Sequence, residues 1–182
     1  LGQETGTAVA DILFGDTNPS GKMPVSVPRS VGNIPAYYNH KPTARRGYAF
    51  ADVTPLYAFG EGMSYTAFDI SEPILSSSIM GVDEETSVSV EVTNTGMMAG
   101  EEVVQLYIRD KVSSVTRNVK DLKGFKRVSL VPGETKTVTL PIRKESLWFY
   151  NLDMERVVEP GEFDIMIGNS SQNVKSVTLT VQ

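Results

Sequence analysis

The chain has 182 residues, of which 40% are hydrophobic and 21% charged, a balance that allows a buried core and excludes a disordered chain. Its formal net charge of -5 leaves no basic surface for phosphates, which excludes nucleic acid as an expected partner. There is no cysteine and one histidine, His40, which excludes disulfides, thiolate zinc sites and multi-histidine metal sites. No apolar run approaches the roughly 20 residues that span a bilayer. We therefore expect no cofactor, no metal and no membrane partner.

The chain opens on a helical pattern. Val9, Ile12 and Leu13 recur at helical spacing, and Gly15 stands where a glycine commonly ends a helix. This predicts a short amphipathic helix over residues 5–15.

A strand is predicted next. Turn-forming residues fill positions 16–21, and the alternation over residues 22–28 is typical of a brief strand bounded by prolines. One helix and one strand cannot close a sheet. We interpret residues 1–29 as the C-terminal remnant of an α/β domain whose other strands lie upstream.

The next segment shows no periodicity in its hydrophobic residues. Residues 30–67 combine prolines, glycines and seven tyrosines or phenylalanines without helical or strand alternation. A long aromatic segment of this kind is usually packed across another surface. We expect an ordered linker draped between two domains.

Residues 68–182 read as short strands separated by turns, which is typical of a β-sandwich. Proline-glycine turns interrupt the pattern over residues 131–134 and 159–162. The fold class is therefore mainly β, an immunoglobulin/fibronectin type III-like sandwich preceded by the αβ remnant. The fibronectin-like variant is preferred because the cysteine pair of antibody domains is absent. The predicted strands are 86–93, 102–109, 125–130, 135–142, 163–168 and 174–181.

Two of these strands carry the clearest patterns. The strand over residues 86–93 places its valines on one face, while the strand over 102–109 has large side chains on both faces. In the strand over 86–93, one face carries Val88, Val90 and Val92. In the strand over 102–109, one face carries Val104, Leu106 and Ile108, and the other carries Val103, Gln105 and Tyr107.

The acidic pairs do not predict catalysis. Neighbouring carboxylates in an extended segment, as in Glu84-Glu85 and Glu101-Glu102, point to opposite faces, and beside turns they are normally solvated. Helix capping or loop chemistry explains the polar residues around the first helix, Glu4, Asp11, Asp16 and Asn18.

Arg45, Arg46 and Tyr48 are the candidate substrate-binding residues. Guanidinium groups offer fixed donors to sugar hydroxyls, and a tyrosine offers a flat apolar face. The alternative, which is favoured, is a salt bridge and packing against a neighbouring domain.

Two further motifs have a structural and a functional interpretation. The aromatic run 148–150 favours packing over a carbohydrate platform. The sequon Asn169-Ser170-Ser171 matters only in a secreted eukaryotic protein.

Several stretches together resemble the C-terminal part of glycoside hydrolase family 3, the β-glucosidase and β-xylosidase type. They cover nearly the whole chain in order, and the one departure is Glu61, a position where the family most often has an aromatic or small residue. The stretches are GQETGTAVADILFGD (2–16), NPSGKMP (18–24), PLYAFGEGMSYTAF (55–68), VTNTG (92–96), VVQLY (103–107), LKGF (122–125) and EPGEF (159–163).

The resemblance implies a parent enzyme with a TIM barrel, an α/β sandwich and a fibronectin-like domain. Its retaining mechanism uses two carboxylates about 5 Å apart. The nucleophilic aspartate and the acid/base glutamate would both lie upstream of Leu1, so this chain is expected to contain no catalytic residue and to be inactive alone. The implied substrates are oligosaccharides or aryl glycosides with a terminal β-linked glucose or xylose.

The remaining expectations concern partners and location. The upstream domains of the parent enzyme are the expected partners, and self-association would cover apolar surface left exposed on the first residues. A bacterial periplasmic or secreted location is favoured for the parent. The alternative from another class is a stand-alone carbohydrate-binding or adhesion module.

Overall fold

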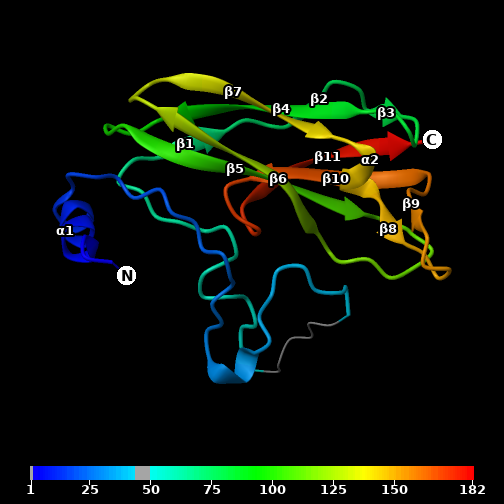
Figure 1. The fold of residues 1–182 in the computed structure, drawn as a ribbon, viewed down its shortest axis with the longest axis horizontal. Helices are drawn as coiled ribbons and strands as arrows, with labels where there is room; N and C mark the ends of the chain where they lie inside the picture. Colours follow the sequence, from blue (N-terminus) through cyan, green and yellow to red (C-terminus); the bar gives the residue numbers. More distant parts are fainter. Residues whose placement is uncertain (1, 44–49) are drawn as a thin grey trace.

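The computed structural model describes residues 2–43 and 50–182. Two β-sheets pack face to face, and parts of the N-terminal segment lie on the outer side of the second sheet, with α1 standing apart from the sandwich (Figure 1). This arrangement confirms the predicted β-sandwich. Within the described residues, no helix is both long and apolar enough to cross a bilayer.

The first sheet is built around β4 (Thr86–Asn94). On one edge β4 pairs along nearly its whole length with β7 (Thr135–Ile142), and on the other edge it pairs with the short strands β1 (Phe68–Ile70) and β2 (Ile74–Leu75). All of these pairings are antiparallel.

The second sheet has five strands in the order β3-β11-β10-β5-β6. Only the β3–β11 pair is parallel. The strands are β3 (Ile79–Met80), β5 (Gly100–Asp110), β6 (Asp121–Leu130), β10 (Gly161–Gly168) and β11 (Val174–Val181). The other elements are α1 (Thr5–Phe14), the 3-10 turn Val31–Asn33, α2 (Lys144–Leu147) and the hairpin β8 (Phe149–Tyr150) and β9 (Arg156–Val157).

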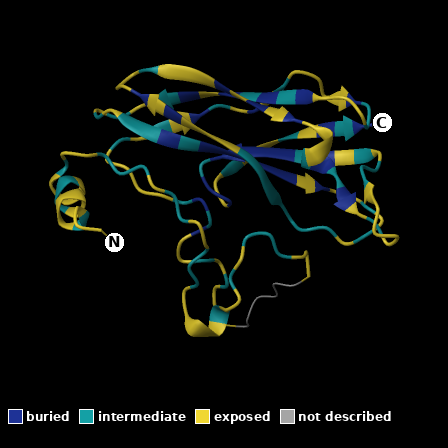
Figure 2. Cartoon of the chain, viewed as in Figure 1, coloured by how far each residue is buried: buried dark blue, intermediate teal, exposed yellow. Residues whose placement is uncertain are grey.

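The core lies between the two sheets, because strand alternation sends every second side chain inward. Figure 2 shows the buried residues concentrated on these strands, whereas α1 is exposed or only half covered. The largest fully buried apolar side chains include Val88, Val92, Val104, Leu106, Leu130, Ile142, Phe163, Ile165 and Leu179.

Strand β5, whose sequence places large side chains on both faces, is buried on both of them. Leu106 and Ile108 belong to the core cluster, while Gln105 and Tyr107 on the opposite face are also buried. The cover over that second face comes from the N-terminal segment, since Tyr38 lies edge-on to Tyr107 with ring centroids 5.6 Å apart.

The predicted first helix is confirmed, and Gly15 ends it with a left-handed φ of 86°. The predicted strand over residues 22–28 is wrong. This segment runs extended but forms only an isolated bridge between Val27 and Tyr57. Prolines within and at the end of the segment cannot donate to a ladder, and its other backbone groups bond a turn, as when Met23 donates to Glu61 at 2.8 Å.

Candidate functional site

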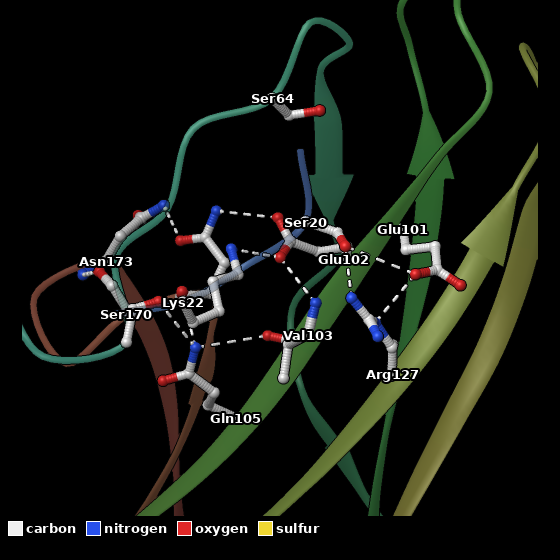
Figure 3. A network of polar contacts seen from close by, with 12 residues as sticks. Ser20, Lys22, Ser64, Glu101, Glu102, Val103, Gln105, Arg127, Ser170 and Asn173 are labelled. Carbon is white, nitrogen blue, oxygen red and sulfur yellow. Dashed lines mark hydrogen bonds and ion pairs between the residues drawn. The ribbon is translucent and has the colours of Figure 1, made fainter. Parts of the chain in front are cut away.

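The contact surface between the N-terminal segment and the second sheet is the best-defined polar site, and we call it the junction. It joins residues 18–24 and 57–62 to the outer face of β5 and β6 and to the β10–β11 loop over residues 169–173. Figure 3 shows its polar contacts.

The side chain of Gln105 lies at the centre of the junction with only 3% of its surface exposed. Its amide nitrogen donates to the carbonyl oxygens of Gly60 at 3.0 Å and Asn169 at 2.8 Å. Its amide oxygen accepts from the Tyr107 hydroxyl at 2.5 Å. A buried amide without partners is costly, so Gln105 fixes the positions of the turn, the loop and the tyrosine together.

An ion pair between Lys22 and Glu102 forms the second connection. The ammonium lies 2.5 Å from Glu102 Oε1, and the two side chains are 16% and 6% exposed. The same carboxylate accepts from the Val103 amide at 2.7 Å and from the Asn169 side chain at 3.4 Å. The buried charge is therefore both paired and hydrogen-bonded, which burial of a carboxylate requires.

The burial of Glu102 corrects the sequence interpretation, in which the Glu101-Glu102 pair was solvated. Its neighbour Glu101 is more open and binds Arg127, with Nε 2.9 Å from Oε2. Glu101 also accepts from Ser129 at 2.7 Å, and Arg127 donates to Ser20 (Figure 3). The two carboxylates thus hold different parts of the junction.

The turn over residues 57–62 needs a glycine at its centre. Gly60 has a left-handed φ of +79°, and a Cβ at this position would lie 2.0 Å from Gln105 Oε1. Glu61, the departure from the family pattern, stabilises the same turn, because its Oε2 accepts from the Ala58 amide at 2.7 Å. The carboxylate is therefore compatible with this turn.

Aromatic rings extend the junction along β5. Tyr38 stacks on Phe59 with centroids 4.3 Å apart, and its hydroxyl accepts from the Leu122 amide at 3.2 Å. Burial raises the pKa of both Tyr38 and Tyr107 above the ordinary tyrosine value.

The candidate substrate-binding residues Arg45, Arg46 and Tyr48 lie outside the described residues. The aromatic run 148–150 is engaged within the chain: the Arg156 guanidinium lies over Trp148, 4.2 Å from the ring centroid, and 5.3 Å from that of Tyr150. This contact supports the packing interpretation of these rings.

Two other sequence motifs are placed by the structure. The Asn169 side chain of the sequon bonds Glu102 and Asn173 within the junction. His40 lies in the linker, and its carbonyl accepts from the Val119 amide at 2.9 Å. Across residues 2–43 and 50–182, no group of three or more histidine, cysteine or acidic side chains could hold a metal ion.

Comparison with known proteins identifies both sides of the junction. Residues 1–65 match the glycosyl hydrolase family 3 C-terminal domain, and residues 102–171 match the fibronectin type III-like domain. The chain corresponds to the C-terminal part of glycoside hydrolase family 3 proteins. The family 3 resemblance inferred from the motifs is thereby confirmed.

Individual relatives lead to the same family. The chain is 48% identical over 187 residues to a β-xylosidase of Formosa agariphila, covering 100% of this chain and 26% of that protein. It is 49% identical over 185 residues to a periplasmic β-glucosidase of Salmonella typhimurium, covering 96% of this chain and 24% of that protein.

A solved structure gives the same result. A β-glucosidase of Erythrobacter marinus superposes with a TM-score of 0.95 and 47% identity, covering 97% of this chain and 24% of that one. The chain thus spans about a quarter of the length of the curated relatives it matches, and it corresponds to their C-terminal part.

Replacing Gly60 with alanine should disrupt the junction. Gly60→Ala combines an unfavourable left-handed φ with a collision against Gln105, whereas Gly133→Ala has a similar φ of +77° and no atom within 4 Å of the new Cβ. We expect Gly133→Ala to lower the free energy of unfolding by about 1 kcal/mol and Gly60→Ala by about 2 kcal/mol more. Urea unfolding measures both, and equal losses would contradict the close approach.

Removing the charge of Glu102 should be costly because Lys22 would remain buried without a counter-ion. We expect Glu102→Gln to lower the free energy of unfolding by about 3 kcal/mol. The control is Glu85→Gln in the exposed pair with Arg143, whose side chains are 63% and 57% exposed, and it should cost at most about 0.5 kcal/mol. Similar losses in the two variants would show that the Lys22–Glu102 pair is solvated.

The raised pKa of Tyr107 predicts an alkaline loss of stability. Above about pH 10 the unfolded chain releases the phenolic proton while the folded chain retains it, so the free energy of unfolding falls as pH rises, by up to about 1.4 kcal/mol per pH unit. Tyr107→Phe should be less stable at neutral pH but show a shallower decline above pH 10. Urea unfolding of both proteins between pH 7 and pH 12 tests this prediction. An equally steep loss of stability above pH 10 in Tyr107→Phe would refute the role of Tyr107.

Proposed function

We propose that the chain completes and braces the catalytic part of a retaining, exo-acting β-glycosidase that releases terminal β-linked glucose or xylose. The observation that supports this most is the junction. It joins the segment matched by the family 3 C-terminal domain to the segment matched by the fibronectin-like domain through buried polar bonds. The names of the relatives, β-xylosidase and β-glucosidase, support the choice of sugars.

The proposed division of the chain assigns residues 1–29 to the end of an α/β domain, 30–67 to a linker and 68–182 to the sandwich. In this scheme the linker is a structural component of the sandwich surface, since Tyr38, which stacks on Phe59, lies edge-on to Tyr107. The two upstream carboxylates of the family mechanism would act on a part of the enzyme that this chain supports.

Helix α1 supports the proposal that upstream domains are the partner. No residue of α1 is buried, and Val9, Leu13 and Phe14 are 49%, 72% and 85% exposed. Within the described residues its backbone is tied to the linker by the Tyr65 hydroxyl, which donates to the Ile12 carbonyl at 2.6 Å. An amphipathic helix with an open apolar face is normally covered, here by the rest of an α/β domain or, in the isolated chain, by a second copy.

The role of Arg45, Arg46 and Tyr48 in contacting substrate stays a prediction from the sequence. Their neighbour in the chain, His40, lies in a segment attached to residues 116–122, because Lys41 donates to the Thr116 carbonyl at 2.5 Å.

A replacement experiment tests the bracing function. The C-terminal quarter of the Formosa agariphila β-xylosidase is removed and this chain is fused in its place. We expect the truncated enzyme to lose activity on nitrophenyl β-xyloside and the fusion to regain it, while this chain alone turns over neither that substrate nor nitrophenyl β-glucoside. Turnover by the isolated chain that disappears when one of its own carboxylates is replaced would overturn the proposal, as would full activity of the truncated enzyme.

A further inference from the structure

A hollow lies beside the junction, between the turn over residues 57–62 and the β10–β11 loop. It encloses about 400 Å³, within the range of small-molecule sites. One carboxylate, three amides and one hydroxyl line it, in addition to a glycine. The lining residues are Glu61, Gly62, Asn169, Ser170, Gln172 and Asn173, and we call this site the polar hollow.

The walls of the polar hollow are held in place by the junction. The Asn169 side chain donates to Glu102 and accepts from the Asn173 amide group at 2.8 Å. The Ser170 hydroxyl accepts from the Asn173 backbone at 3.0 Å, and Figure 3 shows these two residues on the loop that faces Lys22. A ligand would therefore meet preorganised groups, which lowers the entropy cost of binding.

The same walls keep hydrogen-bonding capacity for a ligand. Glu61 uses Oε2 to accept from Ala58, while its Oε1 has no protein partner in the described part of the chain. The side-chain amide of Gln172 likewise has no hydrogen-bond partner among the described residues, and it is exposed at the rim of the polar hollow. A carboxylate oxygen beside amide donors and acceptors matches vicinal hydroxyl groups, each of which both donates and accepts.

Two other hollows fit a ligand less well. In the hollow next to residues 16–20, two of the three carboxylates, Glu101 and Glu134, are already paired with Arg127 and Lys136. The apolar hollow beside Phe125 has its Gln105 amide engaged within the junction.

We propose that the polar hollow is a binding site for a single sugar ring or a similar polyol, carried by this chain. No aromatic ring is among its lining residues, so ring stacking does not contribute to binding. We expect a dissociation constant in the millimolar range, which corresponds to a binding free energy on the order of -4 kcal/mol. A divalent cation fits less well, because one carboxylate alone lines the hollow and calcium sites gather several oxygen ligands.

Titration of the isotope-labelled chain tests this proposal by NMR. Methyl β-glucoside, methyl β-xyloside and calcium chloride are each added, to about 100 mM for the sugars. We expect saturable shifts of the backbone amides of residues 61–62 and 169–173 with at least one sugar. Gln172→Ala and Glu61→Gln should each weaken binding by about tenfold.

The matched control is Glu91→Gln, an exposed carboxylate on β4 outside the polar hollow, which should bind like the unsubstituted chain. Because Gln172 is exposed, its variant keeps the test valid if Glu61→Gln unfolds the turn. Absence of saturable shifts, shifts that survive both substitutions, or saturation by calcium alone would each overturn the proposal. These results are independent of the replacement experiment, which measures catalysis in a fused enzyme.

Discussion

The buried carboxamide of Gln105 is the constraint on which the junction depends. Its partners are the carbonyl of Gly60, 45 residues away in the chain, and that of Asn169, 64 residues away. Each bond would be lost if the segment that accepts it moved, and a buried amide left without a partner costs free energy. The backbone therefore approaches Gln105 so closely that only glycine fits at position 60.

The buried ion pair of Lys22 and Glu102 is a second constraint on the junction, because each buried charge needs the other as its counter-ion. Together they make the segment matched by the family 3 domain and the sandwich a single structural unit, although separate family models describe them. The arrangement also explains why β5 has large side chains on both faces. One face fills the core, and the other is covered by the N-terminal segment.

The two proposals concern different consequences of this unit. A rigid junction can transmit support to an α/β domain, and the exposed apolar face of α1 marks where such a domain would attach. The polar hollow uses the same rigidity differently. Glu102 forms the ion pair with Lys22 and also accepts a hydrogen bond from Asn169. One buried carboxylate therefore stabilises both the junction and the wall of the polar hollow.

The sequence by itself determined the sandwich, the first helix and the family. Strand β4 and the C-terminal halves of β7 and β11 alternate between inward and outward side chains, and Gly15 and the proline-glycine turns specify local backbone conformations that depend on few distant contacts. Their periodicity was sufficient because one face of each strand must be buried.

Only the tertiary structure decided the rest. The strands β1, β2, β3, β8 and β9 have two or three residues each, too few for a period. Residues 22–28 alternate like a strand, yet their backbone partners lie in a turn rather than in a ladder. Glu102 looked solvated because sequence neighbours reveal nothing of Lys22, 80 positions earlier, and the burial of a charge is set by such distant partners.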